Sequence, residues 1–213
     1  EFRQAYRLLT LKVAYRCIHI PSSISEVQAA VRTLKYAEFL RFFTAIQLMR
    51  STDGIHITKK PKIFSSKKIQ QAIQSLSFEL TADQKDTLEK ILNDMGSTHT
   101  MYRLVQGDVG CGKTVVATLA LYAAFLSGYQ GAMLAPTEIL ARQHYISVNQ
   151  VLAPFGVKTE VLYSALTPAK KKEILEDVAS GKINILIGTH SMIQDSVTFH
   201  KLGLTIADEQ QRF

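Results

Sequence analysis

A glycine-rich run in the middle of the chain carries the residues best suited to chemistry. The run is Gly107-Asp108-Val109-Gly110-Cys111-Gly112-Lys113-Thr114, which matches the pattern G-x-x-x-x-G-K-[ST]. Glycines allow backbone amides to turn inward around phosphate oxygens, and a helix that begins at the end of the run adds a partial positive charge. We expect Lys113 to reach the β- and γ-phosphates of a nucleotide and Thr114 to bind Mg²⁺. The whole run therefore predicts a phosphate-binding site.

Two adjacent carboxylates near the end of the chain complement this run. Asp208 and Glu209 follow an apolar stretch, residues 202–207, that predicts a strand. A carboxylate at the carboxyl end of a parallel strand faces the crevice where a nucleotide binds. We expect Asp208 to bind Mg²⁺ through water and Glu209 to orient or deprotonate an attacking water. The second carboxylate favours hydrolysis over phosphate transfer to a small molecule, because small-molecule kinases need no residue that activates water.

The elements that must position these residues alternate between strands and helices. Thr81-Ala82-Asp83-Gln84 has the capping-box pattern, which predicts a helix through residue 95. Further helices are expected from the glycine-rich run to about residue 127 and at residues 138–152 and 168–179. Strands are expected at residues 101–106, 131–135, 157–163, 183–187 and 202–207. This alternation is typical of βαβ units and predicts an α/β domain with a central parallel sheet.

The front of the chain predicts a basic helical appendage. A short extended piece is expected at residues 18–21, a long amphipathic helix from about residue 23 to 50, a linker at 51–66, and a short helix at 67–76. Residues 1–70 hold 13 Lys and Arg against 4 Asp and Glu, a net charge of +9, whereas residues 71–213 hold 12 against 14. A basic segment attached to a near-neutral core indicates a polyanionic partner, although a solvated basic surface is the alternative.

Several classes of protein are disfavoured by the composition. No run of 18 apolar residues occurs, so no membrane span is expected, and the N-terminus does not have the pattern of a signal peptide. The chain does not begin with Met, which suggests a piece of a longer protein. Cys17 and Cys111 lie far apart and match no metal-ligand spacing, which favours a reducing, cytoplasmic setting over a disulfide framework.

Taken together, these motifs resemble those of superfamily 2 helicases and, within them, the RecG branch-migration helicases. The matching segments, in chain order, are residues 78–84, 107–114, 135–141, 188–194 and 208–213. The transcription-repair coupling translocases are the nearest relatives of that family, and Gln211 favours them, because RecG proteins mostly carry His at this position. Residues 135–138 and the helical front segment favour RecG.

The resemblance implies a RecA-like P-loop NTPase domain at residues 67–213, preceded by a helical linker at residues 1–66 that follows a wedge domain. A second RecA-like domain, with its arginine finger, would be absent, so the fragment is expected to be nearly inactive by itself. The full-length protein would be a monomeric, cytoplasmic, nucleoid-associated ATP-dependent DNA helicase. It would use ATP and Mg²⁺ to remodel branched or duplex DNA.

The resemblance also assigns roles to individual residues. Gln84 would hydrogen-bond adenine, although it also fits as the capping-box partner of Thr81, and both roles could hold. Gln211 would sense the γ-phosphate.

The DNA backbone would be faced by four residues, namely Thr137, Arg142, Thr189 and His190, through contacts that do not read sequence. Thr137 has an alternative as a helix cap, Arg142 as a solvated helix charge, and His190 as a loop histidine. His144 and His200 are expected to be surface residues.

Overall fold

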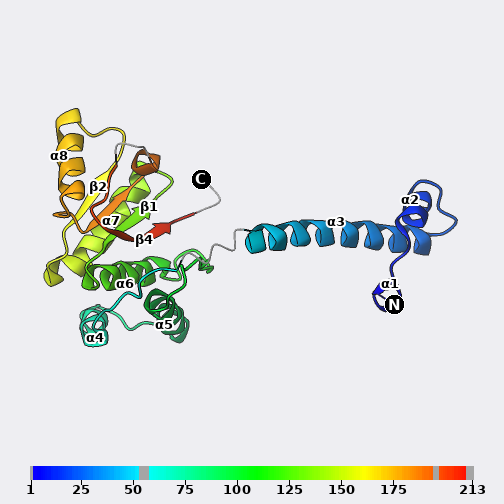
Figure 1. Cartoon of the computed structure of the whole chain (residues 1–213), viewed down its shortest axis with the longest axis horizontal. Coiled ribbons are helices and arrows are strands. Elements are labelled where there is room, and N and C mark those ends of the chain that lie inside the picture. The colour runs from blue at the N-terminus through cyan, green and yellow to red at the C-terminus, as the bar shows by residue number, and fades with distance from the viewer. Residues whose placement is uncertain (1, 53–57, 194–196, 210–213) are drawn as a thin grey trace. The chain divides into compact units, whose positions relative to one another are not determined.

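The computed structural model describes residues 2–52, 58–193 and 197–209, without the side chains of residues 2 and 49–52. The chain divides into two compact units, Glu1–His56 and Ile57–Phe213 (Figure 1). The boundary expected between residues 66 and 67 therefore lies inside the second unit. The main-chain amides of Lys59 and Lys62 explain the difference, because they donate to Thr98 O at 2.8 Å and to Met95 O at 3.0 Å.

The first unit is helical, as the sequence predicts. It contains α1 (Phe2–Ala5), α2 (Leu11–His19) and α3 (Ile24–Thr52). Ala14 and Cys17 of α2 pack against Ala30 of α3. The prediction of an extended piece at residues 18–21 was wrong at its start, because α2 continues through His19. The spacing of Ala14 and Cys17 places both side chains on one helical face, and burying that face favours continuing the helix past Cys17 to His19.

The second unit is built on a four-stranded parallel sheet in the order β2-β3-β1-β4. The strands are β1 (Gln130–Leu134), β2 (Thr159–Leu162), β3 (Ile185–Gly188) and β4 (Leu202–Ala207). Strand β3 is buried along its whole length, as expected for a parallel sheet that is covered on its faces. The predicted α/β class and these four predicted strands are confirmed.

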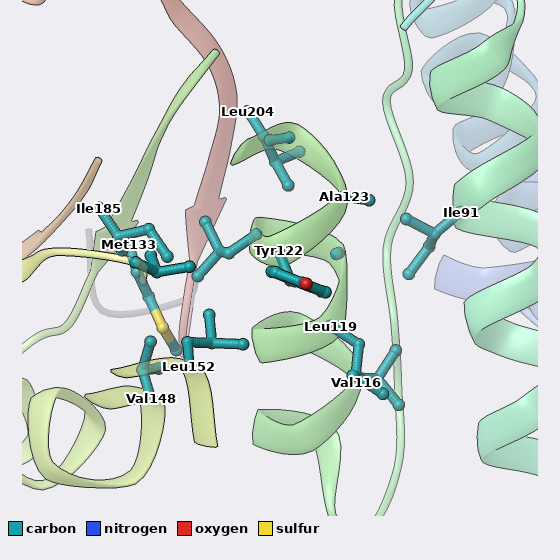
Figure 2. Close-up of a cluster of buried hydrophobic side chains, with 14 of the residues drawn as sticks. Ile91, Val116, Leu119, Tyr122, Ala123, Met133, Val148, Leu152, Ile185 and Leu204 are labelled. Carbon is teal, nitrogen blue, oxygen red and sulfur yellow. The ribbon is translucent and has the colours of Figure 1, made fainter. Parts of the chain in front are cut away.

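Five helices accompany the sheet within the described residues. They are α4 (Ser66–Gln74), α5 (Ala82–Gly96), α6 (Lys113–Leu126), α7 (Glu138–Leu152) and α8 (Pro168–Ala179), with short 3-10 turns η1 (Ala153–Phe155) and η2 (His190–Ile193). Helix α6 is apolar on nearly all sides, and Figure 2 shows it between the sheet and α5, with Ile91 of α5 facing it. Burial raises the pKa of the Tyr122 hydroxyl on this helix. Within the described residues, no helix is both long enough and apolar enough to cross a bilayer.

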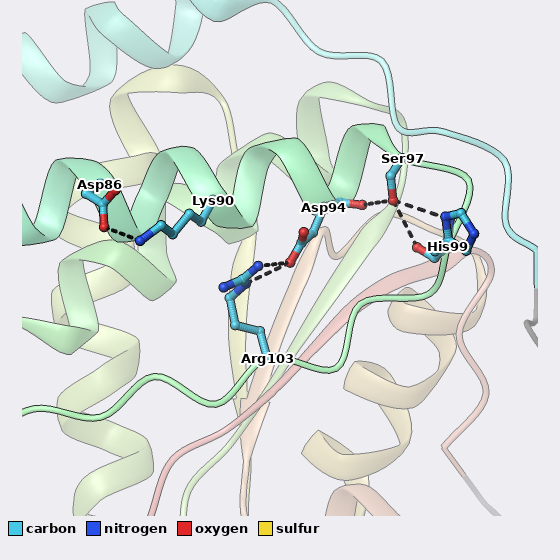
Figure 3. A network of polar contacts seen from close by, with 6 residues as sticks. All are labelled: Asp86, Lys90, Asp94, Ser97, His99 and Arg103. Atoms are coloured by element: carbon cyan, nitrogen blue, oxygen red, sulfur yellow. Dashed lines mark hydrogen bonds and ion pairs between the residues drawn. The ribbon is translucent and has the colours of Figure 1, made fainter. Parts of the chain in front are cut away.

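The strand predicted at residues 101–106 does not form. This segment runs as irregular chain, with Tyr102 and Leu104 strongly exposed. Arg103 instead pairs with Asp94 of α5, its guanidinium 2.6 Å from the carboxylate (Figure 3). The apolar residues of the segment gave the strand prediction, but a strand also needs a neighbour for its hydrogen bonds, and the sheet ladders include no pairing with this segment.

Candidate functional site

The glycine-rich run and the acidic pair share one edge of the sheet. Helix α6 ends at Leu126, the chain reverses through Gly128, and β1 begins at Gln130, so α6 runs back along β1 and its first residue lies near the carboxyl end of that strand. Strand β4 is parallel to β1, and the Asp208 amide that follows it donates to Leu134 O at 2.9 Å. Because α6 packs on both strands, Lys113 and Asp208 lie at the same carboxyl edge.

The glycine-rich loop wraps around the ammonium group of its own lysine. Lys113 Nζ donates to Gly107 O at 2.7 Å and to Asp108 O at 2.8 Å. Gly110 and Gly112 have φ values of 82° and 83°, which favour glycine over any residue with a Cβ atom. The loop therefore curls with its lysine at the centre, at the N-terminus of α6, where backbone amides and the helix dipole favour an anion.

Gln84 ties α5 to this loop. Its Oε1 accepts from the Thr81 amide at 2.9 Å, and Thr81 caps α5 in return, which completes the predicted capping box. Its Nε2 donates to Cys111 O at 2.8 Å. One amide thus hydrogen-bonds both to the start of α5 and to the glycine-rich loop at Cys111. The predicted contact with adenine stays a prediction.

The acidic pair has a partner that the sequence did not predict. His144 Nε2 lies 2.8 Å from Asp208 Oδ2, and the imidazole is buried. The expectation that His144 is a surface residue was wrong. His144 lies on the stripe of α7 that also buries Ala141 and Val148, and this helical spacing was the signal that could have found it. His200 is exposed, as expected.

Glu209 takes a left-handed backbone conformation, with φ at 50°. Non-glycine residues adopt this region rarely, and they often do so at functional sites. The turn at Glu209 follows directly on the Asp208 amide that extends the β1–β4 ladder. The two carboxylates thus leave the sheet in a strained turn at its carboxyl edge.

The four residues expected to face DNA also lie after strands at this edge. Thr137 follows β1 and caps α7, its hydroxyl accepting from the Leu140 amide at 3.3 Å. Thr189 and His190 follow β3, and Thr189 Oγ1 lies 3.2 Å from Ser191 Oγ. Because β1 and β3 are neighbours, the residues that follow them are brought together.

Arg142 is exposed, as the alternative of a solvated helix charge predicts, yet its guanidinium has two partners. Its Nη2 donates to Glu138 Oε1 at 2.9 Å and to the Tyr163 hydroxyl at 2.6 Å, and the guanidinium lies 4.3 Å from the centre of the Tyr163 ring. Tyr163, a nearly buried residue directly after β2, was not singled out from the sequence. An isolated tyrosine has no sequence signal for such a role, and only the strand order brings it to Arg142. Gln211 lies outside the described residues.

The residues present fit a nucleotide with Mg²⁺. Thr114 offers a hydroxyl in the first turn of α6, and Asp208 offers a carboxylate of which His144 contacts one oxygen. Mg²⁺ characteristically binds one or two such protein ligands and completes its shell with phosphate and water. Lys113 and the loop amides supply the positive potential that phosphates require.

Comparison with known proteins decides the family. The model of the DEAD/DEAH box helicases matches residues 71–213. The chain belongs to this family. Within the curated helicases it is 43% identical to the ATP-dependent DNA helicase RecG of Streptococcus pneumoniae, covering 98% of this chain and 31% of that protein. It is also 43% identical to the RecG of Bacillus subtilis, covering 100% and 31%.

Solved helicase structures agree with this assignment. The chain superposes on a structure of RecG bound to a three-way DNA junction with a TM-score of 0.85 and 40% identity, covering 99% of this chain and 29% of that one. A hypothetical ATP-dependent RNA helicase from Sulfolobus tokodaii gives a TM-score of 0.53 at 20% identity, over 69% of this chain and 42% of that one, which shows a shared fold. The chain spans about a third of the length of the curated RecG relatives it matches.

Proposed function

We propose that this chain is the nucleotide-binding part of an ATP-dependent DNA helicase that remodels branched DNA, such as stalled forks and Holliday junctions. The observation that carries the proposal is the shared sheet edge, where a lysine-centred glycine-rich loop and an Asp-Glu pair both lie, in a chain 43% identical to RecG. A helicase that couples ATP hydrolysis to movement needs both a phosphate-binding loop and an acidic pair at that edge.

The residues at the edge divide the work of hydrolysis. Lys113 exchanges its loop carbonyl partners for β- and γ-phosphate oxygens, and the loop amides hold the remaining phosphate charge. Thr114 and Asp208 would hold Mg²⁺, which would neutralise negative charge on the phosphates. Glu209 orients the attacking water and accepts its proton. Gln84 donates to or accepts from the adenine edge while it supports the loop.

The DNA side of the proposal rests on the residues that follow β1 and β3. These residues present hydroxyls, an imidazole and a guanidinium, which bind backbone phosphates without reading sequence. They are Thr137, Thr189, His190 and Arg142. The preference for branched DNA is argued from RecG, whose solved complex holds a three-way junction. Further domains of a longer protein would supply the transition-state cation, so this chain alone should bind ATP weakly and turn it over slowly. Arginine fingers are worth about 10³–10⁵ in rate where measured.

The test uses the full-length protein and its ATPase activity with and without DNA. We expect hydrolysis to be stimulated by a three-way junction, and Lys113→Ala to abolish the stimulated rate. Lys172→Ala is the matched control, because Lys172 is an exposed lysine on α8 and should leave the rate unchanged. ATPase activity that ignores DNA would instead indicate a P-loop enzyme acting on a small molecule. Normal junction remodelling by Lys113→Ala would contradict a motor role for this site.

A further inference from the structure

The contact between His144 and Asp208 joins a buried imidazole to the carboxylate that we place on Mg²⁺. His144 is 7% exposed, and its Nε2 lies 2.8 Å from Asp208 Oδ2. An ionised carboxylate only accepts hydrogen bonds, so Nε2 carries the hydrogen that is donated to it. His144 has no role in the phosphate-binding motif or in the DNA-facing motifs that the sequence indicates.

Both ends of the contact are held by the fold. Helix α7 is anchored by Ala141, Val148 and Leu152, each of which is fully buried, so the position of His144 is set by core packing. The backbone of Asp208 is fixed by its hydrogen bond to Leu134 O at 2.9 Å. What remains free at Asp208 is rotation of its side chain. The imidazole restricts that rotation by binding one of the two carboxylate oxygens.

The backbone conformation of Glu209 makes the restriction on the Asp208 side chain more important. Glu209 adopts a left-handed backbone conformation directly after Asp208, and both residues lie in a turn beyond the end of β4. The side chain of a carboxylate at such a turn can adopt several rotamers unless a hydrogen bond to a neighbouring residue stabilises one of them. Hydrogen bonds to the oxygens of a metal-binding carboxylate fix its direction, and their loss typically costs 10–100-fold in metal affinity or activity.

We propose that His144 is a positioning residue for Asp208: it holds Oδ2 so that the carboxylate presents its other oxygen to Mg²⁺ or to a water on it. This inference rests on the proposed function of the nucleotide site. His144 touches neither nucleotide nor metal. Its effect is therefore on how well Mg²⁺ improves nucleotide binding and hydrolysis, and it leaves binding without Mg²⁺ unaffected.

The experiment compares His144→Phe with His144→Gln in the full-length protein. Phenylalanine keeps an aromatic ring in the core but removes the donor, whereas glutamine carries an N–H donor at a similar reach. His200→Phe is the control, because His200 is exposed and precedes β4 at the opposite edge of the sheet. Affinity for fluorescent ADP is measured in EDTA and over a Mg²⁺ titration, and ATP hydrolysis is measured over the same titration.

We expect His144→Phe to bind ADP in EDTA as wild type does, to lose most of the affinity gained from Mg²⁺, and to need about 10–100-fold more Mg²⁺ for half-maximal hydrolysis. His144→Gln should recover most of this loss, and His200→Phe should match wild type. An unchanged Mg²⁺ requirement in His144→Phe would overturn the proposal. Equal losses in the Phe and Gln variants, or lost ADP binding in EDTA, would also overturn it, because they indicate a packing role. A wild-type protein whose ATPase ignores DNA would contradict the proposed helicase function, yet the ADP titrations would still test His144.

Discussion

Gln130 should contribute strongly to the stability of the second unit, because its buried amide joins three segments. The side chain is 4% exposed. Its Nε2 donates to Val178 O at 2.9 Å and to Ile183 O at 2.7 Å, while its Oε1 accepts from the Lys201 amide at 2.9 Å. The amide therefore connects the end of α8, the entry to β3 and the entry to β4, and it helps to set the order of the strands that carry the site.

The substitution Gln130→Leu keeps the volume and removes all three hydrogen bonds. Val178 O keeps a partner, since the Gly181 amide also donates to it at 3.1 Å. Ile183 O and the Lys201 amide lose their hydrogen bonds to Gln130. Each buried group left unsatisfied costs about 1–3 kcal/mol, and burying leucine in place of an amide returns about 2 kcal/mol. With two such groups the net loss should be about 2 kcal/mol. This corresponds to a fall in Tm of about 4–8 °C for a domain of this size.

Urea denaturation of the chain, followed by circular dichroism, measures this loss as a lower midpoint at an unchanged slope. Gln70→Leu on the exposed face of α4 is the matched control and should stay within about 0.5 kcal/mol of wild type. If Gln130→Leu is as stable as the control, the buried amide does not hold the three segments together and the reasoning is refuted.

Two further substitutions test the geometry of the site. Gly188→Ala places a Cβ against the carbonyl oxygen of Leu162 and the side chain of Met192. We expect this variant to lose about 1–3 kcal/mol of unfolding free energy. In the control Gly96→Ala the added Cβ meets nothing within 4 Å, so this variant should be neutral or slightly stabilised. Gln84→Ala removes the link between α5 and Cys111 O, and should weaken nucleotide binding about 5–30-fold in a titration with fluorescent ADP, as expected for a loss of about 1–2 kcal/mol. Unchanged ADP affinity would show that the phosphate loop holds its shape without this amide.

Local sequence patterns were sufficient for most elements of the second unit. The spacing of apolar residues gave β4 and helices α7 and α8 with their observed bounds, because capping threonines and a helix-starting proline mark those helices locally. The glycine-rich run was recognisable because its motif is contiguous, and the structure gives Gly110 and Gly112 left-handed conformations. The family resemblance came from the same runs of contiguous residues.

Patterns that depend on distant partners were misjudged or missed. Residues 101–106 have the composition of a strand, yet Arg103 lies on Asp94 of α5 and the segment pairs with no strand of the sheet. Tyr163 and His144 act through contacts with Arg142 and Asp208, and the members of each pair are far apart in the chain. The sequence by itself determined which residues form the glycine-rich loop and the acidic pair, and it predicted their chemistry, because both motifs are local. Only the tertiary structure decided what holds Asp208 and Arg142 in place, because strand order and helix packing bring their partners within hydrogen-bonding distance.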